Sequence, residues 1–360
     1  MKDILDFTHE SRAQRVVFRP GAATGATAGE AAGLGLRRLL VVCGSRGTAT
    51  ARAVADSLGP ACVGLHDGAT MHVPVEVADR AVQVVRSAGA DGVVAVGGGS
   101  SVGLGKALAL RTGLPLIAVP STYSGSEMTP VWGLTEGGVK RTGRDPVVLP
   151  RSVVYDPELT LSLPVPLSVT SGVNAIAHAV EALYAPDTTP LIALMAQEGV
   201  RAMAAALPAV ADEPDSPEAR GRALYGAWLC GSCLGATTMG LHHKLCHVLG
   251  GTFDLPHAET HTVVLPYALA YNAPAAPDAA AAVARALDTD DAPSALRELA
   301  ARLGAPRSLA ELGLKEADLA VAAAQTAGQA YANPRAVTVD GALAVLRAAY
   351  EGRAPEFPAD

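Results

Sequence analysis

The sequence contains few aromatic and few charged residues. Aromatic side chains make up 4% of its 360 residues and charged side chains 18%, whereas 49% of the residues are hydrophobic. A chain this long has enough apolar material for a large core, built mainly from alanine, valine and leucine, and it typically folds as two domains. The net charge is −7, and the basic stripe that a nucleic-acid partner requires is missing.

Features of exported and membrane proteins are missing as well. No apolar run reaches the roughly 18 residues of a membrane span, and Asp3 and Asp6 stand where a signal peptide would be apolar. The five cysteines lack the spacing of a disulfide framework. Cys230 and Cys233 form a CxxC inside an apolar helical pattern, which favours small buried thiols over a redox pair. We therefore expect a soluble, cytoplasmic protein without a membrane or nucleic-acid partner.

Strand and helix patterns alternate in the first half of the chain. Short apolar runs typical of buried strands occur at 16–18, 39–43, 63–65, 93–96 and 116–119, with further β-like runs at 131–132 and 147–149. Helical patterns occupy 48–58, 75–88 and 102–110. This alternation predicts a doubly wound parallel sheet, and thus a Rossmann-like α/β domain over residues 1–163.

After residue 163 the strand patterns end. Apolar residues then recur at helical spacing almost to the end of the chain, including the segments 275–286 and 294–303. We therefore expect an all-helical domain over residues 164–360.

A glycine-rich segment follows the strand predicted at 93–96. Gly97, Gly98, Gly99 and Ser100 lead directly into a helix. Glycines let backbone N–H groups face a ligand, and the start of the helix adds unpaired N–H groups and a positive dipole end. A plain tight turn is the simpler interpretation. We favour an anion site for the pyrophosphate of a dinucleotide at the carboxyl edge of the sheet.

Two further loops leave the same predicted edge. The hydroxyl-rich loop after the strand at 116–119 could hold the ribose and nicotinamide through its side chains: Ser121, Thr122, Tyr123 and Ser126. Gly44 and Arg46 follow the strand at 39–43, where no acid is present to hold an adenosine 2′-hydroxyl. Since Arg46 could face a 2′-phosphate, both NADH and NADPH remain candidate cofactors.

Histidines cluster in one segment of the second half. Five of the nine histidines are His242, His243, His247, His257 and His261. His243 and His247 are four residues apart, so they share one face of a helix, which we expect to end at Gly250-Gly251. A second helix is expected to begin near Pro256-His257. Upstream, Asn174 and His178 form another pair four residues apart. Any one of these histidines fits a helix surface or a satisfied core position, but the set favours a shared site.

The chain resembles the iron-containing (group III) alcohol dehydrogenase family. The resemblance covers nearly the whole chain and rests on the GGGS segment, the STYSGSE loop from Ser121, the segment Asp156–Leu159, a polar residue four before His178, and HxxxH followed by PH. It implies a Rossmann-like NAD(P)-binding domain and a helical domain. In that family one aspartate and three histidines hold iron or zinc. The matching positions here are Asn174, His178, His243 and His257.

Two departures from the general pattern point to one branch of the family. Asn174 stands in place of the metal-binding aspartate, and Gly103 in place of an aspartate that usually follows the glycine loop. Together with the run Leu241–Lys244 and the Asn-Pro-Arg at 333–335, they resemble the maleylacetate reductases. That resemblance implies NAD(P)H-dependent reduction of maleylacetate to 3-oxoadipate during aromatic-compound degradation, by an enzyme that is commonly a homodimer and not metal-dependent.

The residues are compatible with that chemistry. An amide in place of a carboxylate should lower the affinity for a hard divalent cation, so we expect no metal. A neutral to cationic imidazole pocket near Lys244 suits a dicarboxylate. We expect His243 and His257 to flank the reacting oxygen, and Asn174 and His178 to position a carboxylate. The remaining expected roles are proton donation by His247, substrate contact by Tyr123, Lys244 and His242, and either a supporting or a surface place for His242 and His261.

Three alternatives remain open. A metal-dependent alcohol or polyol dehydrogenase of the same fold would need a tightly held iron or zinc, conceivably at His178, His243 and His257. A lyase resembling 3-dehydroquinate synthase would need lysines and arginines for a substrate phosphate, in which the loop 120–160 is poor. A non-catalytic binding protein would have little use for both a phosphate site and an imidazole cluster.

Overall fold

The computed structural model describes residues 6–137 and 139–357 and divides into two compact units. The first unit consists of Ser11–Leu163 and Asp215–Leu224. The second consists of Pro164–Pro214 with residues 225–357 and 6–10. A single division after residue 163 would place residues 6–10 in the first unit and residues 215–224 in the second. In the structure, residues 6–10 belong to the second unit and residues 215–224 to the first.

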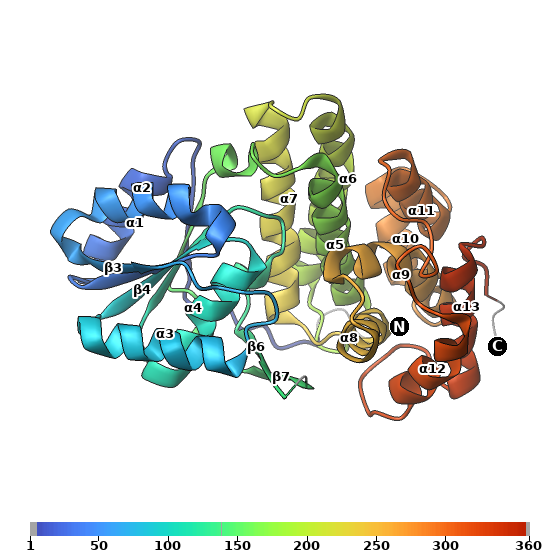
Figure 1. Ribbon diagram of the computed structural model, residues 1–360. Coiled ribbons are helices and arrows are strands. Elements are labelled where there is room, and N and C mark those ends of the chain that lie inside the picture. The colour runs from blue at the N-terminus through green and yellow to red at the C-terminus, as the bar shows by residue number, and fades with distance from the viewer. Residues whose placement is uncertain (1–5, 138, 358–360) are drawn as a thin grey trace. The chain divides into compact units, whose positions relative to one another are not determined.

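The first unit is built around a six-stranded parallel sheet with the strand order β1-β8-β5-β4-β2-β3 (Figure 1). Its strands are β1 (Arg15–Phe18), β2 (Leu39–Val42), β3 (Cys62–His66), β4 (Gly92–Gly97), β5 (Leu116–Pro120) and β8 (Ser152–Tyr155). β2, β4, β5 and β8 are buried throughout, as expected of strands covered on both faces. The parallel α/β sheet predicted from the sequence is confirmed.

Helices cover both faces of this sheet. They are α1 (Ala23–Gly33), α2 (Thr48–Leu58), α3 (Val75–Ala88) and α4 (Gly99–Thr112). Figure 1 shows α1 and α2 on one face and α3 and α4 on the other. Successive residues of β2 separate accordingly, because side chains alternate along a strand: Leu39 and Val41 pack with α1 and α2, and Leu40 and Val42 with α3 and α4.

The prediction of a β-like run at 147–149 is wrong. Pro146–Val148 is a 3-10 turn, because the side chain of Asp145 accepts a hydrogen bond from the amide of Val147 at 2.9 Å and Pro146 has no amide to donate to a strand. The short run at 131–132 belongs to a longer antiparallel hairpin of β6 (Val131–Glu136) and β7 (Val139–Arg144).

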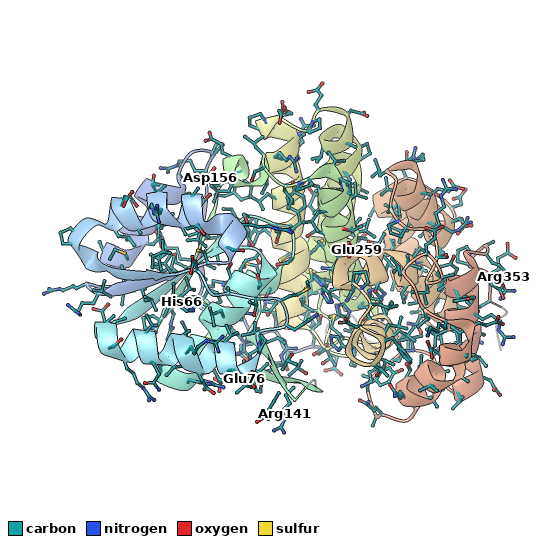
Figure 2. The ribbon with its side chains drawn as sticks, in the orientation of Figure 1. His66, Glu76, Arg141, Asp156, Glu259 and Arg353 are labelled. Carbon is teal, nitrogen blue, oxygen red and sulfur yellow. The ribbon has the colours of Figure 1, made fainter. Side chains whose placement is uncertain are left out.

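Asp156 explains why α1 begins where it does, although the sequence pattern there is mixed. Its carboxylate oxygens accept hydrogen bonds from the amides of Gly21 and Ala23, both at 2.9 Å, and one of them also accepts from Glu158 N at 3.0 Å (Figure 2). A carboxylate at the start of a helix satisfies its free amides and favours its positive end. Asp156, part of the family-like segment 156–159, thus has a structural role here.

The second unit is all-helical in its described residues after 163, as predicted. Its helices are α5 (Val165–Tyr184), α6 (Pro190–Asp212), α8 (Leu241–Phe253), α9 (His257–Asn272), α10 (Pro277–Leu287), α11 (Ala292–Arg302), α12 (Leu319–Ala327) and α13 (Val339–Glu351), while α7 (Pro217–Ala236) runs from the first unit into the second. α5 is buried along most of its length and packs mainly on α6 and α9. Among the described residues, no helix combines the length and the apolar character that a membrane crossing requires.

The connection from α8 to α9 differs from the expectation in one respect. Gly250 and Gly251 do not end α8, which continues to Phe253 and ends at Asp254 in the left-handed conformation, with φ 55°. Pro256 then precedes the first residue of α9, His257. The helix passes through the two glycines because Leu245 and Leu249 are fully buried in the core, and that packing outweighs a cost of about 1 kcal/mol for each glycine.

Candidate active site

The glycine segment lies where β4 ends and α4 begins. Gly97 has φ +130°, and a Cβ there would lie 2.6 Å from Ser101 Oγ. A Cβ on Gly98, the residue before α4, would lie 2.8 Å from Thr122 Cγ2. α4 has no side-chain cap, so its amides and positive dipole end are available to an anion. Only glycine fits both positions without displacement of a neighbour.

The two other loops expected to bind a cofactor leave the same edge of the sheet. Gly97 and Pro120 are register partners in β4 and β5, and Ser121 N donates to Gly97 O at 3.2 Å. Gly44 N, at the end of β2, donates to Ser101 Oγ at 3.1 Å. Arg46 follows on an exposed 3-10 turn. The structure therefore brings these predicted residues around the start of α4, where Ser100 lies in the first turn.

Buried hydroxyls in this region lack protein partners. Within the described residues, Thr122 Oγ1 and Ser124 Oγ are buried without a hydrogen bond. Buried polar atoms normally have partners, so these two hydroxyls are free to bond a ligand. With the uncapped helix and the space left by Gly98, they fit a dinucleotide phosphate and ribose.

The loop after β5 is anchored by a lysine that the sequence analysis did not single out. Lys106, 1% exposed on α4, donates from Nζ to Ser126 O at 2.5 Å, Thr129 Oγ1 at 2.8 Å and Val131 O at 2.8 Å. Burial lowers its pKa to about 7, although Glu127 opposes the shift. Ser126 Oγ also accepts from Lys106 at 3.4 Å, so the structure gives Ser126 an anchoring place in the loop.

Tyr123 is buried beside Arg220. Its side chain is fully buried, and its hydroxyl accepts a hydrogen bond from Arg220 at 3.5 Å. Arg220 is 1% exposed and also donates to Leu163 O at 2.9 Å. The expectation that Tyr123 contacts cofactor and substrate is therefore corrected: Tyr123 packs under the loop, where it meets the segment 215–224.

The histidines from three helices form one cluster in the second unit. His178 from α5 stacks on His243 from α8, with ring centroids 5.2 Å apart and an interplanar angle of 30°. The ring of His261 from α9 lies 5.0 Å from that of His243 and 4.3 Å from that of His257. The ring centroid of His247, one turn after His243, lies 6.2 Å from that of His243. The structure thus assembles the histidines that the sequence analysis expected to share a site.

The cluster has an exposed and a buried layer. His247 and His257 are exposed, whereas His178 and His243 are 3% and 6% exposed, and His242 and His261 are fully buried. His242 Nε2 and His261 Nδ1 lie 2.9 Å apart and share a hydrogen bond. His242 therefore supports the site from behind, and its expected contact with the substrate is corrected. The sequence analysis left His261 either in a supporting position or on the surface. Its burial and this hydrogen bond place it in the supporting position.

Burial lowers the pKa of three imidazoles of the cluster, those of His178, His242 and His261. Burial, reinforced by the neighbouring histidines, lowers the pKa of His178 and His261 well below 6.5. Burial and His243 lower the pKa of His242 to about 3, although Glu181 opposes this shift. Burial thus favours the neutral form of His178, His242 and His261.

A buried acid that the sequence analysis missed lies beside His243. Glu181 on α5 is fully buried, and its Oε2 accepts a hydrogen bond from His243 Nδ1 at 2.7 Å. Burial opposes its ionisation, but the hydrogen bond and charge of His243 outweigh burial and lower the pKa of Glu181 to about 2. A helical signal was available, because Asn174, His178 and Glu181 have i, i+4, i+7 spacing on one face of α5.

Asn174 and Lys244 differ in how they relate to the cluster. Asn174 is 3% exposed, and its Oδ1 is buried without a hydrogen-bond partner among the described residues, as expected of an atom that awaits a ligand. Lys244 donates to Gln329 Oε1, and its Nζ lies 5.9 Å from the centre of the Tyr331 ring. The structure therefore supports a ligand-binding place for Asn174 and turns Lys244 toward the segment before α13.

The donor set at the positions that match the family's metal site lacks a carboxylate. It consists of a neutral amide and three imidazoles, one of them the exposed His257, and hard cations favour carboxylate oxygens. Within the described part of the chain, the group of side chains close enough to share an ion is His242, Cys246 and His261. There the 2.9 Å hydrogen bond between the two imidazoles already uses the nitrogens that would face an ion.

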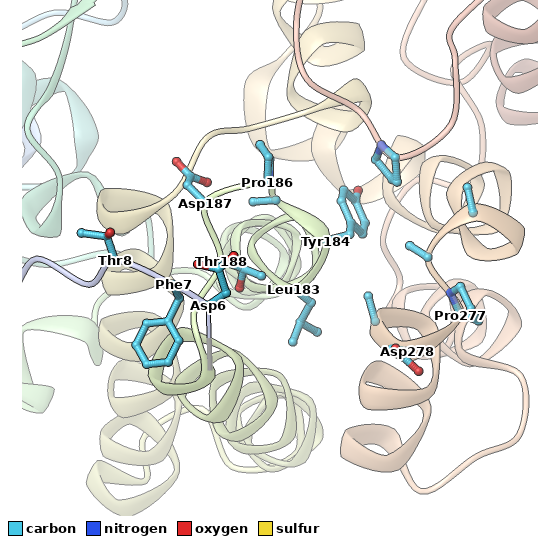
Figure 3. Close-up of a pocket in the computed structure, with 15 residues that line it drawn as sticks. Asp6, Phe7, Thr8, Leu183, Tyr184, Pro186, Asp187, Thr188, Pro277 and Asp278 are labelled. Carbon is cyan, nitrogen blue, oxygen red and sulfur yellow. The ribbon is translucent and has the colours of Figure 1, made fainter. Parts of the chain in front are cut away.

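A cavity of about 420 Å³ lies elsewhere in the second unit (Figure 3). Its wall includes Leu183, Tyr184, Asp187 and Pro277, and none of the clustered histidines. Tyr184 connects it to the cluster, because its hydroxyl donates to Glu181 Oε1 at 3.1 Å. The cavity therefore lies next to Glu181, which supports His243, and not next to the clustered imidazoles.

The chain is similar to known proteins along nearly its whole length. The model of "Iron-containing alcohol dehydrogenase" matches residues 13–157, and that of "Fe-containing alcohol dehydrogenase family, C-terminal" matches residues 168–350. Maleylacetate reductase of Pseudomonas knackmussii is 53% identical, with 98% of this chain and 99% of that protein covered. Maleylacetate reductase of Sphingobium indicum is 51% identical, at the same coverage. The crystal structure of maleylacetate reductase from a Rhizobium species has a TM-score of 0.94 and 52% identity, and the match covers 98% of this chain and 100% of that chain.

Proposed function

We propose that this chain, which belongs to the iron-containing alcohol dehydrogenase family, catalyses the NAD(P)H-dependent reduction of maleylacetate to 3-oxoadipate. The observation that carries the proposal is the histidine cluster, in which Asn174 stands where the family has a metal-binding carboxylate. This cluster can donate hydrogen bonds to a substrate oxygen without holding a cation. The identity of about 50% to maleylacetate reductases supports the same substrate.

The chemistry of maleylacetate suits such a pocket. Its double bond is conjugated to a ketone, so a hydride adds to carbon and negative charge collects on the ketone oxygen as an enolate. Bound NAD(P)H supplies the hydride from C4 of its nicotinamide. Hydrogen-bond donors at the oxygen stabilise the enolate, and an acid then protonates the adjacent carbon.

The cluster offers residues for each of these tasks. We assign hydrogen bonding of the reacting oxygen to His243 and His257, and proton donation to the exposed His247. Asn174 and His178 hold one substrate carboxylate. The orphaned His243 Nε2 supports the first of these assignments, since a buried atom without a partner is ready to meet a ligand. Lys244 contributes positive charge for the dicarboxylate.

The α/β domain, residues 1–163, binds the cofactor in this proposal, and residues 164–360 bind the substrate. Gly97–Ser100 hold the pyrophosphate, and the hydroxyls of Ser121 and Thr122 contact the ribose and nicotinamide end. Arg46, exposed after β2, could face a 2′-phosphate, so NADH and NADPH are both candidate cofactors. A cytoplasmic homodimer that needs no metal completes the proposal.

A spectrophotometric panel tests the function. NADH and NADPH oxidation is measured with maleylacetate and, in the reverse direction, NAD and NADP reduction with simple alcohols, each with and without a chelator. We expect turnover with maleylacetate that survives chelation. Turnover of alcohols that depends on iron or zinc would instead identify a metal-dependent dehydrogenase.

The histidine assignment needs its own variants. His243→Ala and His257→Ala should each lower kcat/KM for maleylacetate by at least about 100-fold. Glu198→Gln, at an exposed ion pair with Arg201 on α6, is the matched surface control and should keep normal rates. Near-normal rates in both histidine variants would show that the cluster is not the active site.

A further inference from the structure

Glu181 is surrounded by donors from the first turn of α8. Its Oε2 accepts from Gly240 N at 2.9 Å and lies 3.4 Å from His243 N, and its Oε1 accepts from His242 N at 2.9 Å. The Tyr184 hydroxyl adds a further bond to Oε1 at 3.1 Å. A buried carboxylate with this many donors is held in one orientation, and the positive end of α8 favours its negative charge.

This arrangement determines how His243 is presented. A carboxylate can only accept, so the 2.7 Å contact requires a proton on His243 Nδ1. Nε2 is then the end that meets a reactant: it accepts a hydrogen bond or a proton when the ring is neutral, and it donates to the reacting oxygen when the ring carries a second proton. His243 Nε2 is buried without a hydrogen-bond partner among the described residues, as expected of an atom reserved for a reactant.

Asn333 also binds the start of α8, so its loss can be compared with the loss of Glu181. Its Oδ1 accepts from Leu241 N at 3.1 Å, and its amide exchanges hydrogen bonds with Asn272. Asn333 thus caps the same helix end as Glu181, but its side chain bonds to Leu241, Asn272 and Arg335 rather than to the His243 ring. If Glu181 were only a cap, the loss of Glu181 and the loss of Asn333 would have similar consequences.

We propose that Glu181 is a positioning residue of this active site: its carboxylate fixes the Nδ1–H form of His243 and turns Nε2 toward the reactant. The inference rests on the proposed function for its effect on rate, but the placement of the proton is independent of the substrate. Glu181 has no contact with the reacting atoms in this scheme. It acts through His243, as carboxylates behind catalytic histidines generally do.

The kinetic test compares Glu181→Gln, Asn333→Ala and the surface control Glu198→Gln. The amide of Gln keeps the shape but loses the charge and one acceptor, so kcat should fall about 100-fold while KM for maleylacetate changes less than about threefold. Asn333→Ala should lower thermal stability with a loss of kcat below about threefold. A kcat of Glu181→Gln within threefold of the wild type, or an equal loss in Asn333→Ala, would overturn the proposal.

The spectroscopic test uses ¹⁵N-labelled histidine, with His243→Gln to assign the ring signals. In the wild type Nδ1 of His243 should be protonated, and in Glu181→Gln this signal should move or exchange faster with water. An unprotonated Nδ1 in the wild type would refute the proposal, whatever the substrate is. If the wild type fails to reduce maleylacetate but Nδ1 is protonated and depends on Glu181, the proposed function fails and the positioning role stands.

Discussion

The buried histidines should make the second unit sensitive to acid. A histidine in the unfolded chain binds a proton below about pH 6.5. In the folded chain the pKa of His242 is lowered to about 3, so it binds a proton only near that pH. Between these values the unfolded state binds more protons, so stability is present above pH 6.5 and is lost as the pH falls. The folded pKa values of His178 and His261 are lowered in the same direction.

The magnitude follows from the shift. Each such histidine costs about 1.4 kcal/mol per pH unit below 6.5, so His242 alone removes roughly 4 kcal/mol by pH 3. With three such groups the slope approaches about 4 kcal/mol per pH unit, against a total stability of roughly 5–15 kcal/mol for a domain. Glu181, with its pKa lowered to about 2, adds to the loss below about pH 4.5. The unit should therefore unfold at mildly acidic pH.

The assay is urea unfolding between pH 7.5 and 5.0, followed by tryptophan fluorescence. Trp228 lies in the second unit and Trp132 in the first, so a Trp132→Phe background reports on the second unit alone. Replacing the bonded pair His242 and His261 by leucine should reduce the slope of unfolding free energy with pH by about 2.7 kcal/mol per unit. Leu245→Ala, at a fully buried position on the same helix and without a titrating group, is the control and should lower the stability but keep the slope.

The reasoning would be refuted if the double leucine variant showed the same pH slope as its parent. That result would mean that the paired imidazoles accept protons in the folded state without penalty, and that burial does not keep them neutral. A reduced absolute stability with a reduced slope would still agree with the reasoning, because the slope counts protons and not packing.

Three further predictions concern single sites. Gly98→Ala should raise KM for NAD(P)H about tenfold and leave KM for maleylacetate unchanged, because its Cβ would lie 2.8 Å from Thr122; Gly25→Ala, with nothing within 4 Å, is the control in steady-state kinetics. Lys106→Met should abolish a rise in unfolding free energy between pH 7 and 10 in the wild type, because the lowered pKa makes the unfolded lysine bind more protons in that range; urea melts of the first unit through Trp132 measure it, and an unchanged rise would count against the assignment. Asn174→Asp should gain a Zn²⁺-dependent increase in Tm of several degrees that the wild type lacks, and an equal increase in the wild type would contradict the donor-set argument.

Local sequence patterns were sufficient for the elements that are regular and buried. The runs at 39–43 and 93–96 are strands because both faces are covered, and a continuous apolar run is what such burial requires. The segment 147–149 has the same composition but turns, because Asp145 binds the amide of Val147. α1 escaped the pattern because its start depends on Asp156, more than 130 residues away. Where an element depends on a distant partner, composition carries little signal.

The candidate site shows the same division between local and distant information. Spacing alone predicted that His243 and His247 share a helix and that His257 begins another, and the structure agrees. Spacing could not tell that His242, next to His243, points to His261 and is fully buried, because that choice depends on how α8 packs against α9.

The sequence analysis did not predict a role for Glu181, because the family pattern concerns the acid at the metal position and not an acid beside it. Replacing the metal-binding aspartate by Asn174 leaves the site without that carboxylate, yet the structure retains a negative charge, held against the opposite side of the His243 ring from Nε2. A carboxylate that faces a substrate oxygen would repel a dicarboxylate and its enolate, whereas one behind the imidazole orients the ring without meeting either. The amide at Asn174 and the carboxylate at Glu181 are therefore consistent with a single requirement. The negative charge lies behind His243 and not in contact with the substrate.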